Sequence, residues 1–199
     1  SYCGILGIRP THGWISVDGV IPFAPSFDVV GWFARDADVF QRVGDVLLGA
    51  TASPAPARRL IVAKDAFAEV DPALGNALKP AIDTLSALVG RPHEMQISSD
   101  GLDAWFKVFR IVQGAEIWAN RREWIEETKP MIGPGIRQRI EWASTLEPNA
   151  IAQARAQFKT IRDHLRGLLE AGDILCLPTS PRVAPLKGLP QDKLEIEYR

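Results

Sequence analysis

Hydrophobic residues recur at helical spacing in two segments of the first half of the chain and through most of the second half. Asp36 is in position to cap a helix that ends at Gly49, and Asp71-Pro72 opens a second helix that ends at Gly90. Apolar positions three and four residues apart give each helix one face to bury. The same spacing predicts three outer helices in the second half, at Leu102–Thr128, Ile136–Leu146 and Ala150–Ala171.

Short apolar runs bounded by glycine and proline predict the strands. The predicted strands are Gly4–Pro10, Trp14–Val17, Leu60–Ala63, Arg91–Ile97 and Asp173–Leu177. The strand–helix–strand order in the first hundred residues favours an α/β fold with parallel pairing. The stretch Val20–Trp32 contains two prolines and no charge before Asp28, so we expect an ordered loop that is covered by protein.

Composition and charge narrow the classes of partner. The 199 residues are 46% apolar and 24% charged, which is typical of a globular chain that can bury one substantial core. The 23 basic and 24 acidic side chains are interspersed, so no basic face for nucleic acid is expected. No apolar run approaches the roughly 20 residues that span a bilayer, and no membrane partner is expected.

The cysteines and histidines indicate neither a disulfide scaffold nor a metal site. Cys3 and Cys176 lie in apolar stretches, as buried free thiols do, which favours a reducing, cytoplasmic compartment. Burial would raise the pKa of both thiols, so a Cys–His nucleophile is set aside. The histidines His12, His93 and His164 lack metal-ligand spacing, and no glycine-rich phosphate loop is present. No metal and no cofactor are expected.

The first 36 residues carry a dense series of glycines and prolines that ends in Ser26-Phe-Asp28, Gly31 and Ala34-Arg35-Asp36. Each glycine alone would only shape a turn. In this order the run resembles the segment that follows the nucleophile in the amidase signature family. A shorter run, Asp173–Pro185, resembles the later strand of that family and its Pro-Thr-x-Pro loop.

The resemblance implies an α/β/α sandwich with a mixed, mainly parallel sheet, of which this chain is a part. Members of the family hydrolyse carboxamides with a Ser–cis-Ser–Lys triad, and the resemblance places all three residues upstream of Ser1. No catalytic residue is therefore expected in this segment, which alone would be inactive. As part of a single amidase domain, residues 1–100 would supply core, 101–172 outer helices and pocket wall, and 173–199 a return strand and loop.

For substrate binding we predict Pro178, Thr179, Ser180 and Pro181, because ligands of α/β sheets bind beyond the carboxyl ends of strands. The alternative is a plain turn. Trp118, in an aromatic stripe with Trp105, Phe106 and Phe109, is a further candidate for the pocket wall, although such stripes are more often core.

Asp28 and Arg35 are expected to act structurally, as an acceptor and a donor that fix the loop behind the active site. Buried charges of this kind are tolerated only when they are paired and hydrogen-bonded.

The resemblance predicts an amidase that converts a small carboxamide into a carboxylate and ammonia or an amine. Gly31-Trp-Phe-Ala-Arg35 departs from the commoner pattern, in which proline replaces Trp32, and is similar to the branch that contains plant indole-3-acetamide hydrolases and a chloroplast import receptor without catalysis. The alternative is therefore an inactive amidase-like binding or docking module.

The aromatic residues of 102–128 favour an aryl or indolyl acetamide as the substrate. A homodimer is left open, and an unrelated α/β domain would require the opening motif to be accidental.

Overall fold

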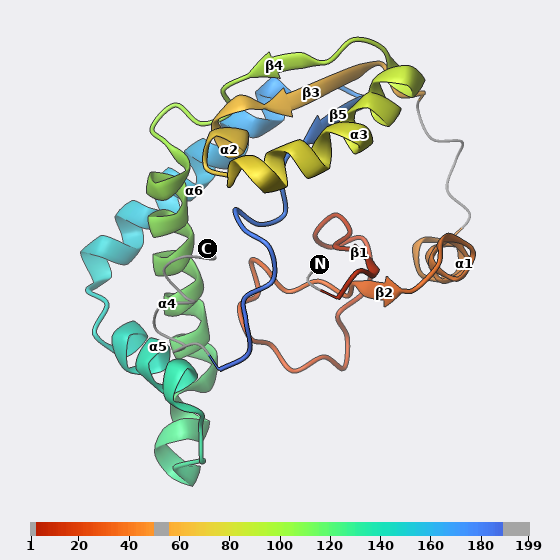
Figure 1. The fold of residues 1–199 in the computed structure, drawn as a ribbon. Helices are drawn as coiled ribbons and strands as arrows, with labels where there is room; N and C mark the ends of the chain where they lie inside the picture. The colour runs from red at the N-terminus through yellow and green to blue at the C-terminus, as the bar shows by residue number, and fades with distance from the viewer. Residues whose placement is uncertain (1–2, 50–55, 189–199) are drawn as a thin grey trace. The chain divides into compact units, whose positions relative to one another are not determined.

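The computed structural model describes residues 3–49 and 56–188, which form two compact units. Unit 1 comprises residues 1–53 and 109–155, and unit 2 comprises residues 54–108 and 156–199. Helices α4 and α6 contribute residues to both units (Figure 1). The elements are β1 (Leu6–Ile8), β2 (Trp32–Ala34), α1 (Ala37–Leu48), β3 (Arg59–Ala63), α2 (Lys64–Ala68), α3 (Pro72–Val89), β4 (His93–Met95), α4 (Leu102–Thr128), α5 (Pro134–Ser144), α6 (Pro148–Leu168) and β5 (Asp173–Cys176).

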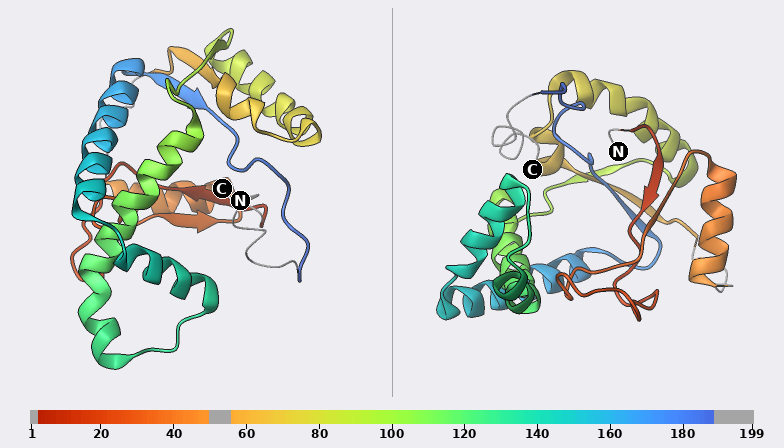
Figure 2. Two further views of the ribbon diagram at one scale, coloured as in Figure 1. Left: turned by 90° about the vertical axis from the view of Figure 1, so that its left-hand side faces the viewer. Right: turned by 90° about the horizontal axis from the view of Figure 1, so that it is seen from below.

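A parallel sheet with the strand order β4-β3-β5 forms the centre of unit 2. Strand β3 lies in the middle and buries four of its five residues, as expected for a strand covered on both faces. Helix α3 lies against one face of the sheet and the unit 2 part of α6 against the other (Figure 2). Ala63, Ala66 and Ile97 form a buried cluster against which Leu168 and Leu175 pack. The predicted α/β/α layering and the parallel pairing are confirmed.

In unit 1, β1 and β2 form an antiparallel pair that packs beside α1. The Asp36 carboxylate accepts a hydrogen bond from the Val39 N–H at 2.8 Å, so the predicted N-cap of α1 is confirmed. Trp32 is 8% exposed, and its indole N–H donates to the Phe40 carbonyl at 3.1 Å. The tryptophan therefore joins β2 to α1 through both packing and a hydrogen bond.

The predicted strand at Trp14–Val17 is wrong. The Trp14 N–H donates to the Thr11 carbonyl and the Val20 N–H to the Val17 carbonyl, each at 3.0 Å, so turn hydrogen bonds occupy these backbone groups. The loop before β2 is ordered and irregular as predicted. However, Ile21 is 70% exposed and Phe23 is 46% exposed, so only part of this loop is covered in unit 1.

Two elements were not predicted, β2 and the short helix α2. The buried state expected for Cys3 is also wrong, since this thiol is exposed, whereas Cys176 is half-buried. Within residues 3–49 and 56–188, no helix is long and apolar enough to cross a bilayer, and no three metal-ligating side chains lie close enough together to hold an ion.

Candidate active-site region

The carboxyl ends of β3, β4 and β5 lie at one edge of the parallel sheet in unit 2. The Leu177–Pro181 loop leaves β5 at this edge, and α2 begins directly after β3. In α/β folds this edge is where ligands bind, because side chains from successive loops converge there. The edge is therefore the part of unit 2 in which a substrate pocket is expected.

The predicted Pro178–Pro181 loop is held by hydrogen bonds at its far end. The Asp71 N–H donates to the Pro181 carbonyl at 3.0 Å, which ties the loop to the start of α3. The Ser180 hydroxyl donates to the Arg182 carbonyl at 3.0 Å. Pro178, Ser180 and Pro181 are half-buried, and Thr179 is exposed.

Asp65, in the first turn of α2, organises the same edge. Its carboxylate accepts hydrogen bonds from the Ile97 N–H at 3.2 Å, the Ser98 N–H at 2.9 Å and the Ser98 hydroxyl at 2.7 Å. Burial alone would raise the pKa of Asp65, but the three hydrogen bonds outweigh it and hold that pKa below its ordinary value. The ionised carboxylate thus joins the segment after β4 to the segment after β3.

Cys176 is the last residue of β5, directly before the loop, and its thiol is half-buried. Burial raises its pKa, so the thiol stays protonated at neutral pH and is a poor nucleophile.

In unit 1, Asp28 closes the irregular loop on itself. Its carboxylate accepts the Phe23 N–H at 2.9 Å and the Ala24 N–H at 3.1 Å. The Arg9 guanidinium donates to the Phe27 carbonyl at 2.6 Å, and His12 Nε2 lies 2.8 Å from the Pro25 carbonyl oxygen. Arg35 is exposed and has no hydrogen-bond partner among the described residues. The structural roles of Asp28 and Arg35 stay predictions.

Helix α4 holds this loop from the other side within unit 1. The Glu116 carboxylate accepts the Ser26 N–H at 2.9 Å and the Ser26 hydroxyl at 2.6 Å. The Arg121 guanidinium donates to the Pro22 carbonyl. Phe27 and Phe109 meet edge to face, with ring centroids 5.0 Å apart. Sequence reasoning identified neither Glu116 nor Arg121, because nothing local to a helix shows which distant loop its charged residues reach.

Trp118 lines a pocket of about 480 Å³ in unit 1, between α4 and the beginning of α6. Small side chains, among them Ala115 and Ala119, line the pocket beside the indole. The predicted loop residues 178–181 belong to unit 2, whereas Trp118 belongs to unit 1, so the prediction that they share one substrate pocket stays a prediction.

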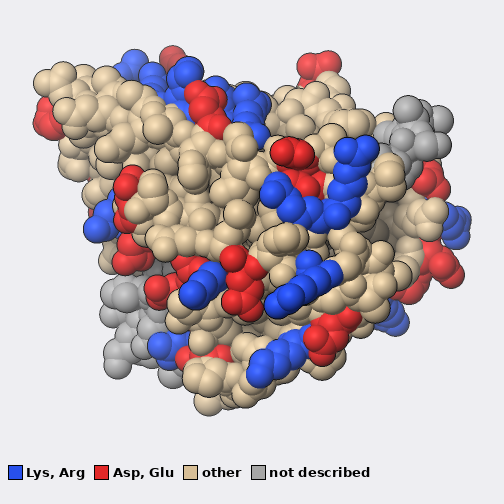
Figure 3. Space-filling view, turned by 90° about the horizontal axis from the view of Figure 1, so that it is seen from above, with Lys and Arg blue, Asp and Glu red and all other residues tan. Residues whose placement is uncertain are grey.

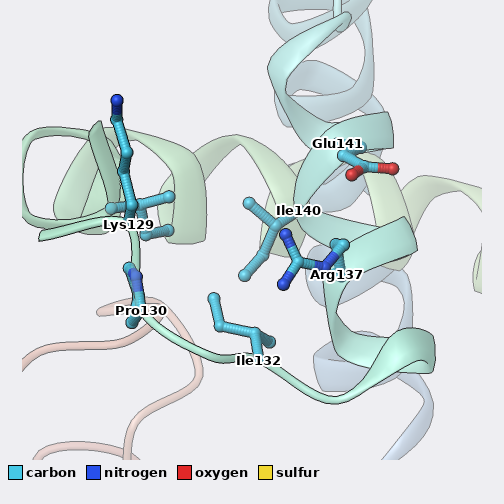
Figure 4. Close-up of a pocket in the computed structure, with 7 residues that line it drawn as sticks. Lys129, Pro130, Ile132, Arg137, Ile140 and Glu141 are labelled. Atoms are coloured by element: carbon cyan, nitrogen blue, oxygen red, sulfur yellow. The ribbon is translucent and has the colours of Figure 1, made fainter.

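A second pocket of about 320 Å³ lies where α4 ends and α5 begins. Ile132 and Ile140 form part of its wall, and the Arg137 guanidinium lies between them (Figure 4). The Lys129 ammonium points away from these residues in the same view. On the face that Figure 3 shows, basic and acidic side chains are interspersed, which agrees with the mixed charge pattern of the sequence.

Residues 1–87 match the family model described as Amidase. Amidase 1 of Arabidopsis thaliana is 32% identical over 93% of this chain and 51% of its own length. A protein of Pisum sativum described as "Translocon at the outer membrane of chloroplasts 64" is 27% identical over 94% of this chain and 36% of its own length. A solved structure described as "Crystal structure of amidase" gives a TM-score of 0.78 at 20% identity, over 94% of this chain and 43% of that chain.

The fold and these similarities agree on one class of protein, an α/β amidase-type domain. The chain belongs to the amidase signature family. It spans about half the length of the Arabidopsis relative. The resemblance expected from the motifs at 2–36 and 173–185 is thereby confirmed.

Proposed function

We propose that the protein of which this chain is a part is an amidase that hydrolyses a carboxamide to a carboxylate and ammonia or an amine. The match of residues 1–87 to the amidase model is the observation that carries the proposal. The loop before β2 lies in the same matched segment, and Asp28 and Glu116 accept backbone hydrogen bonds that hold it.

The proposed chemistry is acyl transfer. A serine attacks the amide carbon, the amine leaves with a proton, and water then hydrolyses the ester to release the carboxylate. In the family pattern a neutral lysine acts as base through a bridging cis-serine, and backbone N–H groups stabilise the oxyanion. The resemblance to the family implies that all of these groups lie before Ser1. On this proposal, residues 1–199 supply scaffold and substrate-binding surface and are inactive alone. No cofactor is part of this scheme.

For substrate binding we propose the loop Pro178, Thr179, Ser180 and Pro181, together with Trp118. The exposed Thr179 is the group of the loop best placed to contact a substrate. Thr179→Val keeps the shape of the side chain and removes its hydroxyl. If the hydroxyl binds substrate, this change raises KM more than it lowers kcat, whereas a merely structural loop would lose folded protein instead.

Labelling of the intact protein with a fluorophosphonate, followed by peptide mapping, tests the enzyme proposal. A single labelled serine on a peptide that ends near Ser1, together with release of ammonia from an amide, is the expected result. Absence of both would favour the alternative, an amidase-like docking module. The Pisum sativum relative favours that alternative, since it is described as a translocon component.

An aryl or indolyl acetamide is the proposed substrate class, because the residues of α4 are rich in aromatic side chains. Hydrolysis of phenylacetamide faster than of acetamide or butyramide is expected, and the reverse preference would contradict this proposal. A cytoplasmic location and a homodimer remain expectations, to be checked by fractionation and by light scattering.

A further inference from the structure

The Trp118 pocket has features that the amidase proposal does not use. Its volume of about 480 Å³ falls in the range of small-molecule sites. Two arginines line it, Arg122 from α4 and Arg155 from α6. Both belong to unit 1, and so does every other residue that lines the pocket.

The two guanidinium groups carry like charge in one pocket that has no acidic lining residue. Among the described residues, neither Arg122 nor Arg155 has a hydrogen-bond or ion-pair partner. Both are exposed and keep their charge. An anion in this pocket would accept charge-assisted hydrogen bonds from the guanidinium groups, whose planar donors suit carboxylates.

The rest of the pocket is apolar. Ala119 and Ala152 face it from two helices, and their short side chains leave room beside the Trp118 indole. Leu146 and Ile151 are among the larger residues of this apolar lining. A hydrated inorganic anion would gain nothing from such walls, whereas a flat apolar group would bury area against the indole.

We propose that this pocket binds an organic carboxylate with a flat apolar body, such as an aryl carboxylate, with Arg122 and Arg155 contacting the carboxylate and Trp118 the apolar body. The inference goes beyond amide hydrolysis and does not rest on it, because binding of the carboxylate can be measured without any catalytic reaction.

Titration calorimetry of the intact protein with phenylacetate tests the proposal. Phenylacetone has nearly the same shape without the charge and without an amide bond that the proposed activity could hydrolyse, and acetate has the charge without the apolar body. We expect phenylacetate to bind at least roughly tenfold more tightly than either, since a charge-assisted hydrogen bond contributes about this factor. Equal binding of phenylacetate and phenylacetone, equal binding of phenylacetate and acetate, or no binding of phenylacetate would overturn the inference.

Variants assign the binding to this pocket. Arg122→Gln and Arg155→Gln should each weaken phenylacetate binding roughly tenfold or more. Ala152→Leu should abolish it by filling the space, and because Ala152 is exposed, leucine meets no core there. Arg137→Gln is the matched control, since it removes the same charge from the pocket of about 320 Å³ in unit 1. A loss with Arg137→Gln as large as with Arg122→Gln, or no loss with any pocket variant, would overturn the assignment.

The two proposals fail separately. Serine labelling without phenylacetate binding would remove only the carboxylate site. Carboxylate binding that depends on Arg122 and Arg155 in a protein without a labelled serine would remove only the amidase function.

Discussion

Arg59 and Asp173 stand opposite each other in the register of β3 and β5, and their side chains form an ion pair. Arg59 Nε donates to Asp173 Oδ1 at 3.1 Å, and a second guanidinium nitrogen of Arg59 donates to the Leu168 carbonyl at 3.1 Å. The Asp173 side chain is only 4% exposed. One arginine therefore ties the amino ends of two strands to the last residue of α6.

This ion pair predicts a pH-dependent stability. The hydrogen bond from Arg59, aided by the Glu170 N–H, lowers the pKa of Asp173 below its ordinary value. Because the folded pKa lies below the unfolded one, the stabilisation is complete above about pH 4 and is lost as the pH falls through the folded pKa. Asp173→Asn should therefore lower the free energy of unfolding at pH 7. At pH 3 the free energies of unfolding of the variant and the parent should differ less, and urea denaturation measures both. Asp45→Asn, an exposed control, should change neither value; an equal loss at both pH values would argue against the pair.

The Asp65–Ser98 contact predicts a cost for removing one hydroxyl. Ser98 is 1% exposed, so Ser98→Ala leaves Asp65 short of a buried hydrogen-bond donor and should lower the free energy of unfolding by about 1–2 kcal/mol. Asp65→Ala should cost more, because it also leaves the Ile97 and Ser98 N–H groups without their acceptor. Urea denaturation measures both. Ser86→Ala is the matched control, since that hydroxyl donates only within α3 and its loss should be nearly neutral.

Position 31 requires glycine, because there is no space for a side chain beside β1. A Cβ atom at this position would lie 2.4 Å from the Ile8 carbonyl oxygen, a backbone atom that cannot move aside alone. Gly31→Ala should destabilise by about 1–3 kcal/mol and disturb the β1–β2 pair. Gly75→Ala meets nothing within 4 Å inside α3 and should instead stabilise by about 0.5–1 kcal/mol. Thermal melts of the two variants should move in opposite directions, and a neutral Gly31→Ala would show that the two strands can separate freely.

The hydrogen bonds of Glu116 predict that this residue keeps the loop of residues 22–28 in place. Glu116→Ala removes the acceptor of both the Ser26 N–H and the Ser26 hydroxyl, and should cost about 1–3 kcal/mol. Hydrogen exchange of residues 22–28 should accelerate, while exchange in β3 should not change. Glu123→Ala on the same helix removes an exposed carboxylate without a hydrogen-bond partner among the described residues, and serves as the control. Equal exchange in the two variants would mean that α4 does not order the loop.

Asp28→Ala should reduce the yield of folded protein before it affects chemistry. The change leaves the Phe23 and Ala24 N–H groups without their acceptor, and Ala24 is 1% exposed. Circular dichroism and amide hydrolysis by the same preparation separate the two effects. A well-folded but inactive Asp28→Ala protein would instead place Asp28 in the chemistry.

The helices and the central strand were predictable because their signals are local. Asp36 and Gly49 bound α1 as predicted, and the observed range of α4 is the predicted range 102–128. The run Leu60–Ala63 predicted β3 because a strand covered on both faces is apolar throughout. The motifs also predicted the family. The order of turn glycines and prolines along the chain can be recognised without knowing the fold.

Contacts between residues far apart in the chain were decided only by the tertiary structure. Ser26 meets Glu116 across 90 positions and Arg59 meets Asp173 across 114, and no periodicity specifies such partners. Strand β2 is missing from the prediction because three residues become a strand only when β1 pairs with them, and Trp14–Val17 has no such partner in the described chain. The Trp118 pocket also depends on contacts between residues that are far apart in the chain. Local propensity sets each element, whereas the placement of charged and aromatic side chains depends on which surfaces pack together.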